Sequence, residues 1–122
     1  MAITLARGKV VKIDTLTFDF SEDNNATDYM SADQYGQFDS ISIVGPAGAM
    51  QGTITLAALD DFASDETADA SWRTVQSPPG TDITIATDKV TVLTNLPLIA
   101  IRLESDGAEN ADRVFTVYGH LS

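Results

Sequence analysis

The sequence predicts an all-β protein, a single β-sandwich or jelly-roll-like domain of about eight or nine short antiparallel strands. Three observations lead to this fold class. Apolar and polar residues alternate with a period of two in most segments, turn-forming residues separate these segments, and no helical periodicity persists over a long window. A length of 122 residues fits one domain with its own core.

The N-terminal segment is predicted to be an arm or a first strand. Its apolar residues are interrupted by Arg7-Gly8-Lys9, and an interior glycine favours a bulge or a break. We therefore divide the chain into an N-terminal arm or first strand over residues 1–13 and a β-sandwich domain over residues 14–122. Within the domain, Leu16, Phe18 and Phe20 form one apolar row of a strand, and the polar, acidic residues 21–32 are expected to be a loop with room for one helical turn.

The middle of the chain is a series of short strands and turns. Strands are expected over residues 38–44, 53–59, 71–76, 83–85 and 90–93, with turns at Gly45-Pro46-Ala47-Gly48 and Ser77-Pro78-Pro79-Gly80. The acidic residues 60–70 are expected to be an exposed loop, which Phe62 pins to the core.

The closing segment, residues 96–119, has the clearest pattern. Ile99, Ile101 and Leu103 alternate with polar or small residues, and Phe115 and Val117 repeat the pattern after a polar loop. Because Asp106-Gly107 supplies turn chemistry, the two strands are predicted to pair as a hairpin. Ile101 and Phe115 should face a second sheet, with Glu104 and Thr116 exposed.

The charge of the chain is strongly negative but uneven. The net charge is -11, yet Arg7, Lys9 and Lys12 all precede the first acid, Asp14. An acidic surface repels phosphate groups, so we expect neither nucleic acid nor a membrane as partner. One interpretation is that the acidic surface is solvated and maintains solubility. The other is that the basic N-terminal segment docks onto an acidic partner or onto a second copy of the protein. The candidate partner contacts are Ile3, Leu5, Arg7, Lys9 and Lys12.

The residues that catalysis requires are missing from the expected patterns. The chain has no Cys, its single histidine is His120 near the C-terminus, and no Gly-x-Ser-x-Gly elbow or phosphate-binding loop is present. The acidic clusters Asp60-Asp61 with Asp65-Glu66, and Asp106 with Glu109 and Asp112, resemble calcium-binding loops only in composition, because the EF-hand spacing is absent. We expect a protein that is not an enzyme and that needs no cofactor or metal.

The aromatic residues leave two interpretations open. Trp72, Tyr29, Tyr35 and Tyr118 would suit a sugar-stacking platform, but a lone tryptophan in a strand more often packs in the interior while tyrosines sit at strand ends. The second interpretation is favoured.

The second half of the chain resembles small structural proteins of tailed bacteriophages, in particular β-sandwich head decoration (cement) proteins. The residues that carry the resemblance are Ser71-Trp72, Val75-Gln76-Ser77-Pro78, the strands at residues 83–85 and 90–93, Leu96-Pro97-Leu98, and residues 101–105 and 108–119. The resemblance implies a homo-oligomer, often a trimer, that binds the major capsid protein on the outer surface of the virion after synthesis in the host cytoplasm. The alternative is a carbohydrate- or receptor-binding module, because the strands around Arg102 and Arg113 also look like those of discoidin-type sandwiches.

Overall fold

Eight β-strands and two short helical turns make up the part of the chain that the computed structural model describes, residues 9–19, 25–48, 52–94, 98–107 and 111–121. The strands are β1 (Lys9–Phe18), β2 (Ala26–Ser31), β3 (Ser40–Val44), β4 (Ile54–Leu59), β5 (Trp72–Thr74), β6 (Val90–Thr94), β7 (Ala100–Ser105) and β8 (Arg113–Leu121). The helical turns are α1 (Ala32–Tyr35) and the 3₁₀ turn η1 (Asp69–Ser71). The predicted all-β sandwich is confirmed.

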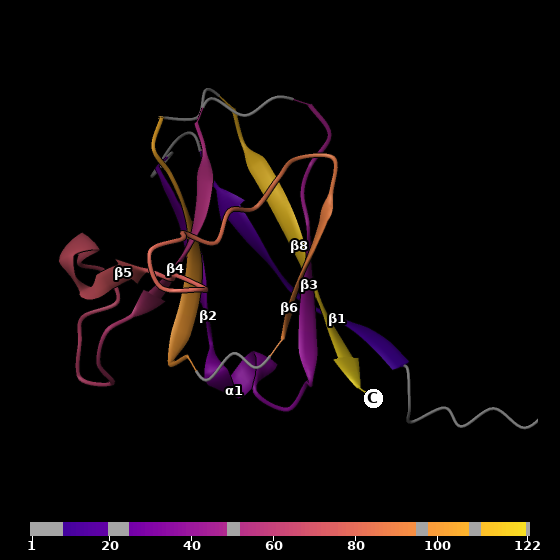
Figure 1. The fold of residues 1–122 in the computed structure, drawn as a ribbon, viewed down its shortest axis with the longest axis horizontal. Helices are drawn as coiled ribbons and strands as arrows, with labels where there is room; N and C mark the ends of the chain where they lie inside the picture. The colour runs from indigo at the N-terminus through magenta and orange to yellow at the C-terminus, as the bar shows by residue number, and fades with distance from the viewer. Residues whose placement is uncertain (1–8, 20–24, 49–51, 95–97, 108–110, 122) are drawn as a thin grey trace, which may run out of the picture.

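The strands form two antiparallel sheets that face each other (Figure 1). The first sheet has the order β1-β8-β3-β6 and the second has the order β2-β7-β4-β5. The first strand pairs with the eighth, the second with the seventh, the third with the sixth and the fourth with the fifth. This nested pairing is that of a long double strand bent back and forth around one core, which is the arrangement of a jelly roll.

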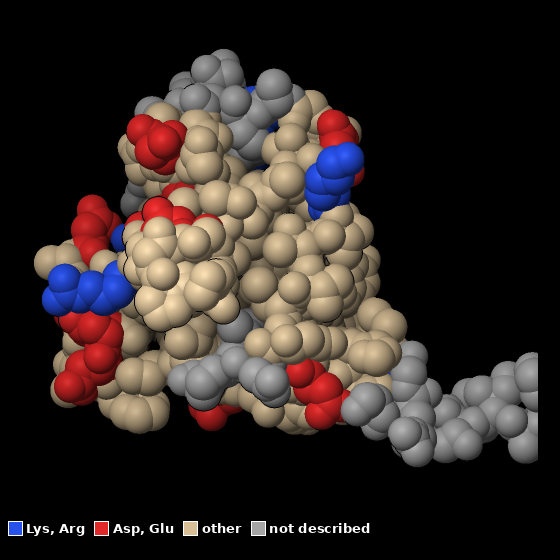
Figure 2. Space-filling view, in the orientation of Figure 1, with Lys and Arg blue, Asp and Glu red and all other residues tan. Residues whose placement is uncertain are grey.

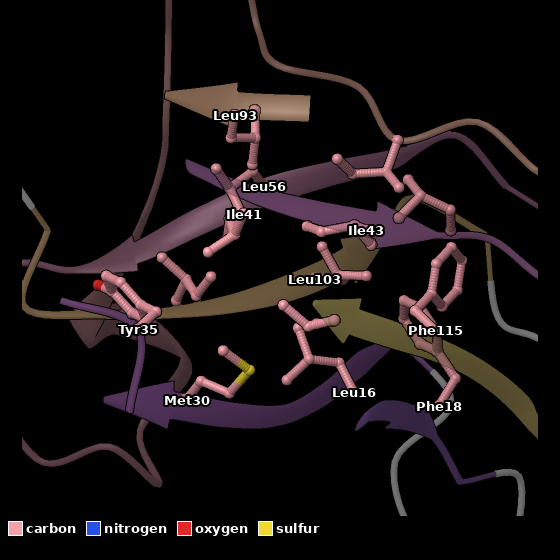
Figure 3. Close-up of a cluster of buried hydrophobic side chains, with 14 residues drawn as sticks. Leu16, Phe18, Met30, Tyr35, Ile41, Ile43, Leu56, Leu93, Leu103 and Phe115 are labelled. Atoms are coloured by element: carbon pink, nitrogen blue, oxygen red, sulfur yellow. The ribbon is translucent and has the colours of Figure 1, made fainter. Parts of the chain in front are cut away.

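The core lies between the two sheets and is built from one apolar row of each long strand (Figure 3). Successive side chains of a strand point to opposite faces, so alternate residues meet in the middle. The largest fully buried side chains are Leu16, Phe18, Met30, Ile41, Ile43, Leu56, Ile101, Leu103, Phe115 and Val117. Phe18 and Phe115 meet edge to face with ring centroids 5.9 Å apart, a favourable aromatic geometry.

The predicted closing hairpin is wrong, although its pattern of burial is right. β7 belongs to the second sheet and β8 to the first, so Ile101 and Phe115 lie in opposite walls of the same core. Both side chains are fully buried, as the alternation predicted. A period of two identifies the buried face of a strand but does not identify the strand's hydrogen-bonding partner.

The predicted loop over residues 21–32 is also wrong where the structure describes it. β2 begins at Ala26 and pairs with β7, and α1 follows it directly. The backbone amide of Ser31 donates to Gln34 Oε1 over 3.1 Å, and Gln34 Nε2 donates to Asp14 Oδ2 over 2.9 Å. These bonds fix α1 against β1 and close one end of the sandwich.

Two further segments differ from the prediction in detail. Residues 83–85 form no strand of their own, but Ile83 and Ile85 exchange backbone hydrogen bonds with β4, and Thr55 and Thr84 form an isolated bridge. β1 continues across the expected boundary between residues 13 and 14, with a register shift between Lys12 and Asp14. Lys9 to Ile13 are therefore part of the first sheet, whereas Phe20 lies outside the described residues.

The burial of Phe115 predicts a large loss of stability on truncation. Phe115→Ala should lower the free energy of unfolding by about 3–5 kcal/mol, because transfer energy is lost and a cavity remains. Thr116→Ala, on the opposite face of β8, should change it by about 0.5 kcal/mol or less. Denaturant titration of both variants measures the difference. A harmless Phe115→Ala beside a costly Thr116→Ala would place the strand in the wrong register.

The buried Tyr35 predicts a pH dependence of stability above neutrality. Desolvation raises the pKa of the Tyr35 phenol to about 12, and its hydroxyl donates to the Leu98 carbonyl. Between about pH 10, where the unfolded phenol ionises, and pH 12 the folded chain retains a proton that the unfolded chain has lost. Stability from this group therefore falls as the pH rises through that range. Urea titrations at increasing pH should give a shallower fall for Tyr35→Phe than for the wild type, and equal slopes would contradict the prediction.

Candidate functional site

Within the described bounds of β1, β3, β6 and β8, the outer face of the first sheet carries no acidic side chain, and we call it the acid-free face. Its residues alternate with the core residues of the same strands, and cross-strand pairing places them in common rows. They are Val10, Lys12, Thr15 and Thr17 of β1, Ser40, Ser42 and Val44 of β3, Val90, Val92 and Thr94 of β6, and Val114, Thr116, Tyr118 and His120 of β8.

Exposed valines give this face apolar area among its serine and threonine side chains. Val10, Val90, Val92 and Val114 are 58%, 59%, 63% and 45% exposed, and they account for four of the six large apolar residues exposed within the described ranges. Lys12 and His120 are the basic side chains of the face, in a chain that carries eighteen acids. Figure 2 shows charged atoms gathered over β5 and the β4–β5 connection, while the flank formed by β3 and β6 is largely tan.

Two of the five predicted partner contacts fall on or beside this face. Lys12 is exposed and pairs with Tyr118, which places it on the face, and the exposed Lys9 pairs with Leu121 at the start of β1. Ile3, Leu5 and Arg7 lie outside the described residues. The structure therefore places Lys12 on the same sheet face as valines of other strands, a surface that the sequence pattern did not identify.

The outer face of the second sheet is covered instead of open. Trp72, only 6% exposed, packs with Ala57, Leu59 and Ala100 in a small second apolar cluster, and its indole nitrogen donates to the Glu66 carbonyl over 3.0 Å. The connection between β4 and β5 is thereby fixed to the sheet. Phe62, expected to pin this loop, is 86% exposed, so that prediction is wrong and Trp72 has the role.

Beneath Trp72 lies a buried arginine. The Arg102 guanidinium carbon lies 4.8 Å from the centroid of the Trp72 ring, within the range of a cation–π contact. Arg102 donates from Nη2 and Nε to Glu104 Oε2 over 2.6 and 2.9 Å, and from Nη2 to Asp69 Oδ1 over 3.3 Å. Tyr29 completes the group, with its ring centroid 5.9 Å from that of Trp72. We call Tyr29, Asp69, Trp72, Arg102 and Glu104 the Trp72–Arg102 cluster.

Two hollows flank this cluster. One, of about 260 Å³, is lined by Asn25, Ala26, Asp69, Trp72, Arg102, Glu104 and Ser105. The other, of about 200 Å³, lies beside Tyr29 and Phe62 over the start of α1. Both are smaller than the sites of about 300–1,000 Å³ that hold drug-sized ligands.

The sugar-stacking platform considered from sequence does not form as one surface. Trp72 and Tyr35 are buried, Tyr118 lies on the acid-free face, and Tyr29 stands beside Trp72 on the opposite sheet. In the favoured interpretation, the interior packing of Trp72 agrees with its burial, although the residue packs in the second cluster and not in the main core. The expected position of the tyrosines at strand ends is wrong, because Tyr29 and Tyr118 lie within β2 and β8 and Tyr35 lies in α1.

The acidic loop residues hold their own backbone. Asp61 accepts from the Ala63 amide, and Asp65 accepts from both the amide and the hydroxyl of Thr67, which lowers the pKa of the Asp65 carboxyl. No group of three or more potential metal ligands occurs in the described ranges, and Glu109 lies outside them. These side chains act as turn-forming acceptors in this structure.

Sequence reasoning missed Arg102 as a buried residue and Glu104 as its partner. Glu104 was expected to be exposed, but its side chain is only 27% exposed and binds Arg102. The signal was present in the neighbourhood, because Ala100, Ile101 and Leu103 give β7 an apolar character on both faces, which is typical of a strand that is covered on both sides.

Comparison with protein-family models, with curated proteins and with solved structures gave no match for this chain. Of the helices in the described ranges, none is long and apolar enough to span a membrane.

Removal of the Arg102 charge should destabilise the protein. Arg102→Met keeps most of the aliphatic stem but leaves Glu104 without its partner, and we expect a loss of about 1–3 kcal/mol in the free energy of unfolding. Arg73→Met is the matched control, since Arg73 is 72% exposed and pairs with Asp60 at 3.5 Å. Its cost should be about 0.5 kcal/mol or less. Equal losses in the two variants, measured by urea titration, would contradict the role of Arg102.

Proposed function

We propose that this protein is a non-enzymatic structural protein that docks onto another protein through its acid-free face. The observation that carries the proposal is the concentration of exposed valines on one flat sheet face that lacks acids, in a chain of net charge -11. Protein interfaces are depleted of charge at their centres, and exposed apolar patches mark interaction sites.

Charge selects which side of the molecule can approach a partner. Where acidic side chains dominate the surface, a second acidic surface is repelled, and contact through the acid-free face avoids this repulsion. Lys12 and His120, at one end of the face, give it a weakly basic edge that suits an acidic rim on the partner. A flat four-stranded face also presents its side chains on a rigid scaffold, so little ordering is required on binding.

The finer form of the proposal is a virion decoration protein. The jelly-roll order supports this form by analogy alone, because viral capsid domains and lectins use the same architecture. The resemblance of the second half of the chain to head decoration proteins of tailed phages points the same way. In this proposal the protein binds the major capsid protein on the outer surface of the phage head, as a homo-oligomer for which a trimer is favoured.

A charge placed on the acid-free face, at the exposed central residue of its edge strand β6, tests the docking. Val92→Glu should lower binding to purified, undecorated phage heads by at least about tenfold, because a buried unpaired carboxylate is costly at an interface. Thr74→Glu adds the same charge to an exposed position of β5 in the other sheet and should bind as the wild type does. Bound copies per particle are counted by quantitative electrophoresis.

Two outcomes would contradict the proposal. Wild-type binding by Val92→Glu would exclude the acid-free face as the contact, and equal loss in both variants would show an effect of net charge alone. Sedimentation equilibrium on the same samples tests the oligomer, since the monomer has a mass of 13.0 kDa.

A further inference from the structure

The hollow beside Arg102 contains polar atoms that the fold itself leaves available. Arg102 uses Nε and Nη2 in its ion pairs, Glu104 uses Oε2 and Asp69 uses Oδ1. In the described part of the chain, no hydrogen bond engages Arg102 Nη1, Glu104 Oε1 or Asp69 Oδ2. No fully buried side-chain nitrogen or oxygen there lacks a partner, so Arg102 Nη1 and Glu104 Oε1 are not fully buried, and the Asp69 side chain is 85% exposed.

These atoms are held in place by packing. The Arg102 side chain is only 8% exposed, with its guanidinium under the Trp72 ring and anchored by two carboxylates. A donor that is fixed in this way loses little freedom when it binds a ligand. The hollow is therefore lined by one anchored arginine and two carboxylate residues, with Trp72 as part of its wall.

Charge limits the class of ligand. Arg102, Glu104 and Asp69 together carry a charge of about -1 at neutral pH, in a chain whose net charge is -11, so an anion is repelled. A divalent cation would need more oxygen ligands, and no group of three metal-binding side chains occurs among the described residues. A neutral ligand that both donates and accepts hydrogen bonds fits the arrangement best.

We propose that this hollow binds a neutral saccharide through a pair of neighbouring hydroxyl groups. Each hydroxyl has one donor and two acceptor positions, so one oxygen can accept from Arg102 Nη1 while the hydroxyl hydrogens are donated to Glu104 Oε1 and Asp69 Oδ2. A volume of about 260 Å³ suits a single sugar ring, and the ring's apolar edge would lie along Trp72. The site goes beyond the proposed docking function and lies on the other sheet.

Trp72 offers a direct readout, because it is the single tryptophan of the chain. Titration with methyl glycosides of glucose, galactose, mannose and N-acetylglucosamine should change its fluorescence and shift its indole N–H resonance. For at least one of them we expect saturation with a Kd of the order of 1 mM, the range of weak polar binding. Asp69→Asn should weaken that binding by about fivefold or more, because a charge-assisted acceptor is lost.

Asp88→Asn is the matched control, since Asp88 is exposed, lies before β6 of the other sheet, and has a φ of 57° that asparagine also adopts. It should bind like the wild type. The proposal is overturned if no glycoside changes the Trp72 signals up to about 100 mM, far above the expected Kd. If anionic N-acetylneuraminic acid bound more tightly than the neutral glycosides, the proposed ligand class would be wrong. Equal weakening by Asp69→Asn and Asp88→Asn would contradict the proposed site.

The same titration on Val92→Glu separates the two proposals. Val92 lies on the acid-free face, so this variant should retain saccharide binding even where it no longer binds phage heads. Loss of saccharide binding in Val92→Glu would contradict a site confined to the second sheet.

Discussion

The structure depends on one constraint, the nested pairing of strands from the two ends of the chain around a single apolar core. β1 must pair with β8, and β2 must pair with β7, before either sheet is complete. Each long strand then gives one apolar row to the same interior, where residues as distant as Leu16 and Phe115 pair across neighbouring strands. Such contacts are far apart in sequence, so the closure of the chain and the formation of its core belong to one cooperative event.

The same pairing makes the two outer faces different. The nested double strand has its tip between β4 and β5, and this connection folds back over the second sheet, where Trp72 and Arg102 hold it. The first sheet contains the first and last strands and no comparable tip, and its valines Val10, Val90, Val92 and Val114 are exposed within the described chain. One topology therefore gives two different outer faces. The face of the second sheet is covered by the β4–β5 connection and has polar hollows, whereas the face of the first sheet exposes valines.

Local pattern predicted burial well and pairing poorly, for a physical reason. The alternation around Ile101 and Phe115 reports which side of a strand avoids water, and both residues are fully buried. It carries no information on the neighbouring strand, so β7 and β8 were joined as a hairpin although they lie in opposite sheets. β2 was missed because Ala26–Ser31 contains only one large aliphatic side chain, Met30, and gains its order from β7.

The candidate surfaces were harder to predict, because each is assembled from separate segments. Lys12 was identified as a contact from its charge, but the valines of the same face come from all four strands of the sheet and appear as a face only after pairing. A bare valine face would favour unspecific association on a neutral protein. On a chain of net charge -11, the acids on the other surfaces would repel an acidic partner. In the proposed docking, such a partner would therefore bind through the acid-free face, in one orientation. In the proposed docking, the acidic composition would limit where a partner can bind, and the acid-free face would supply the area that it binds.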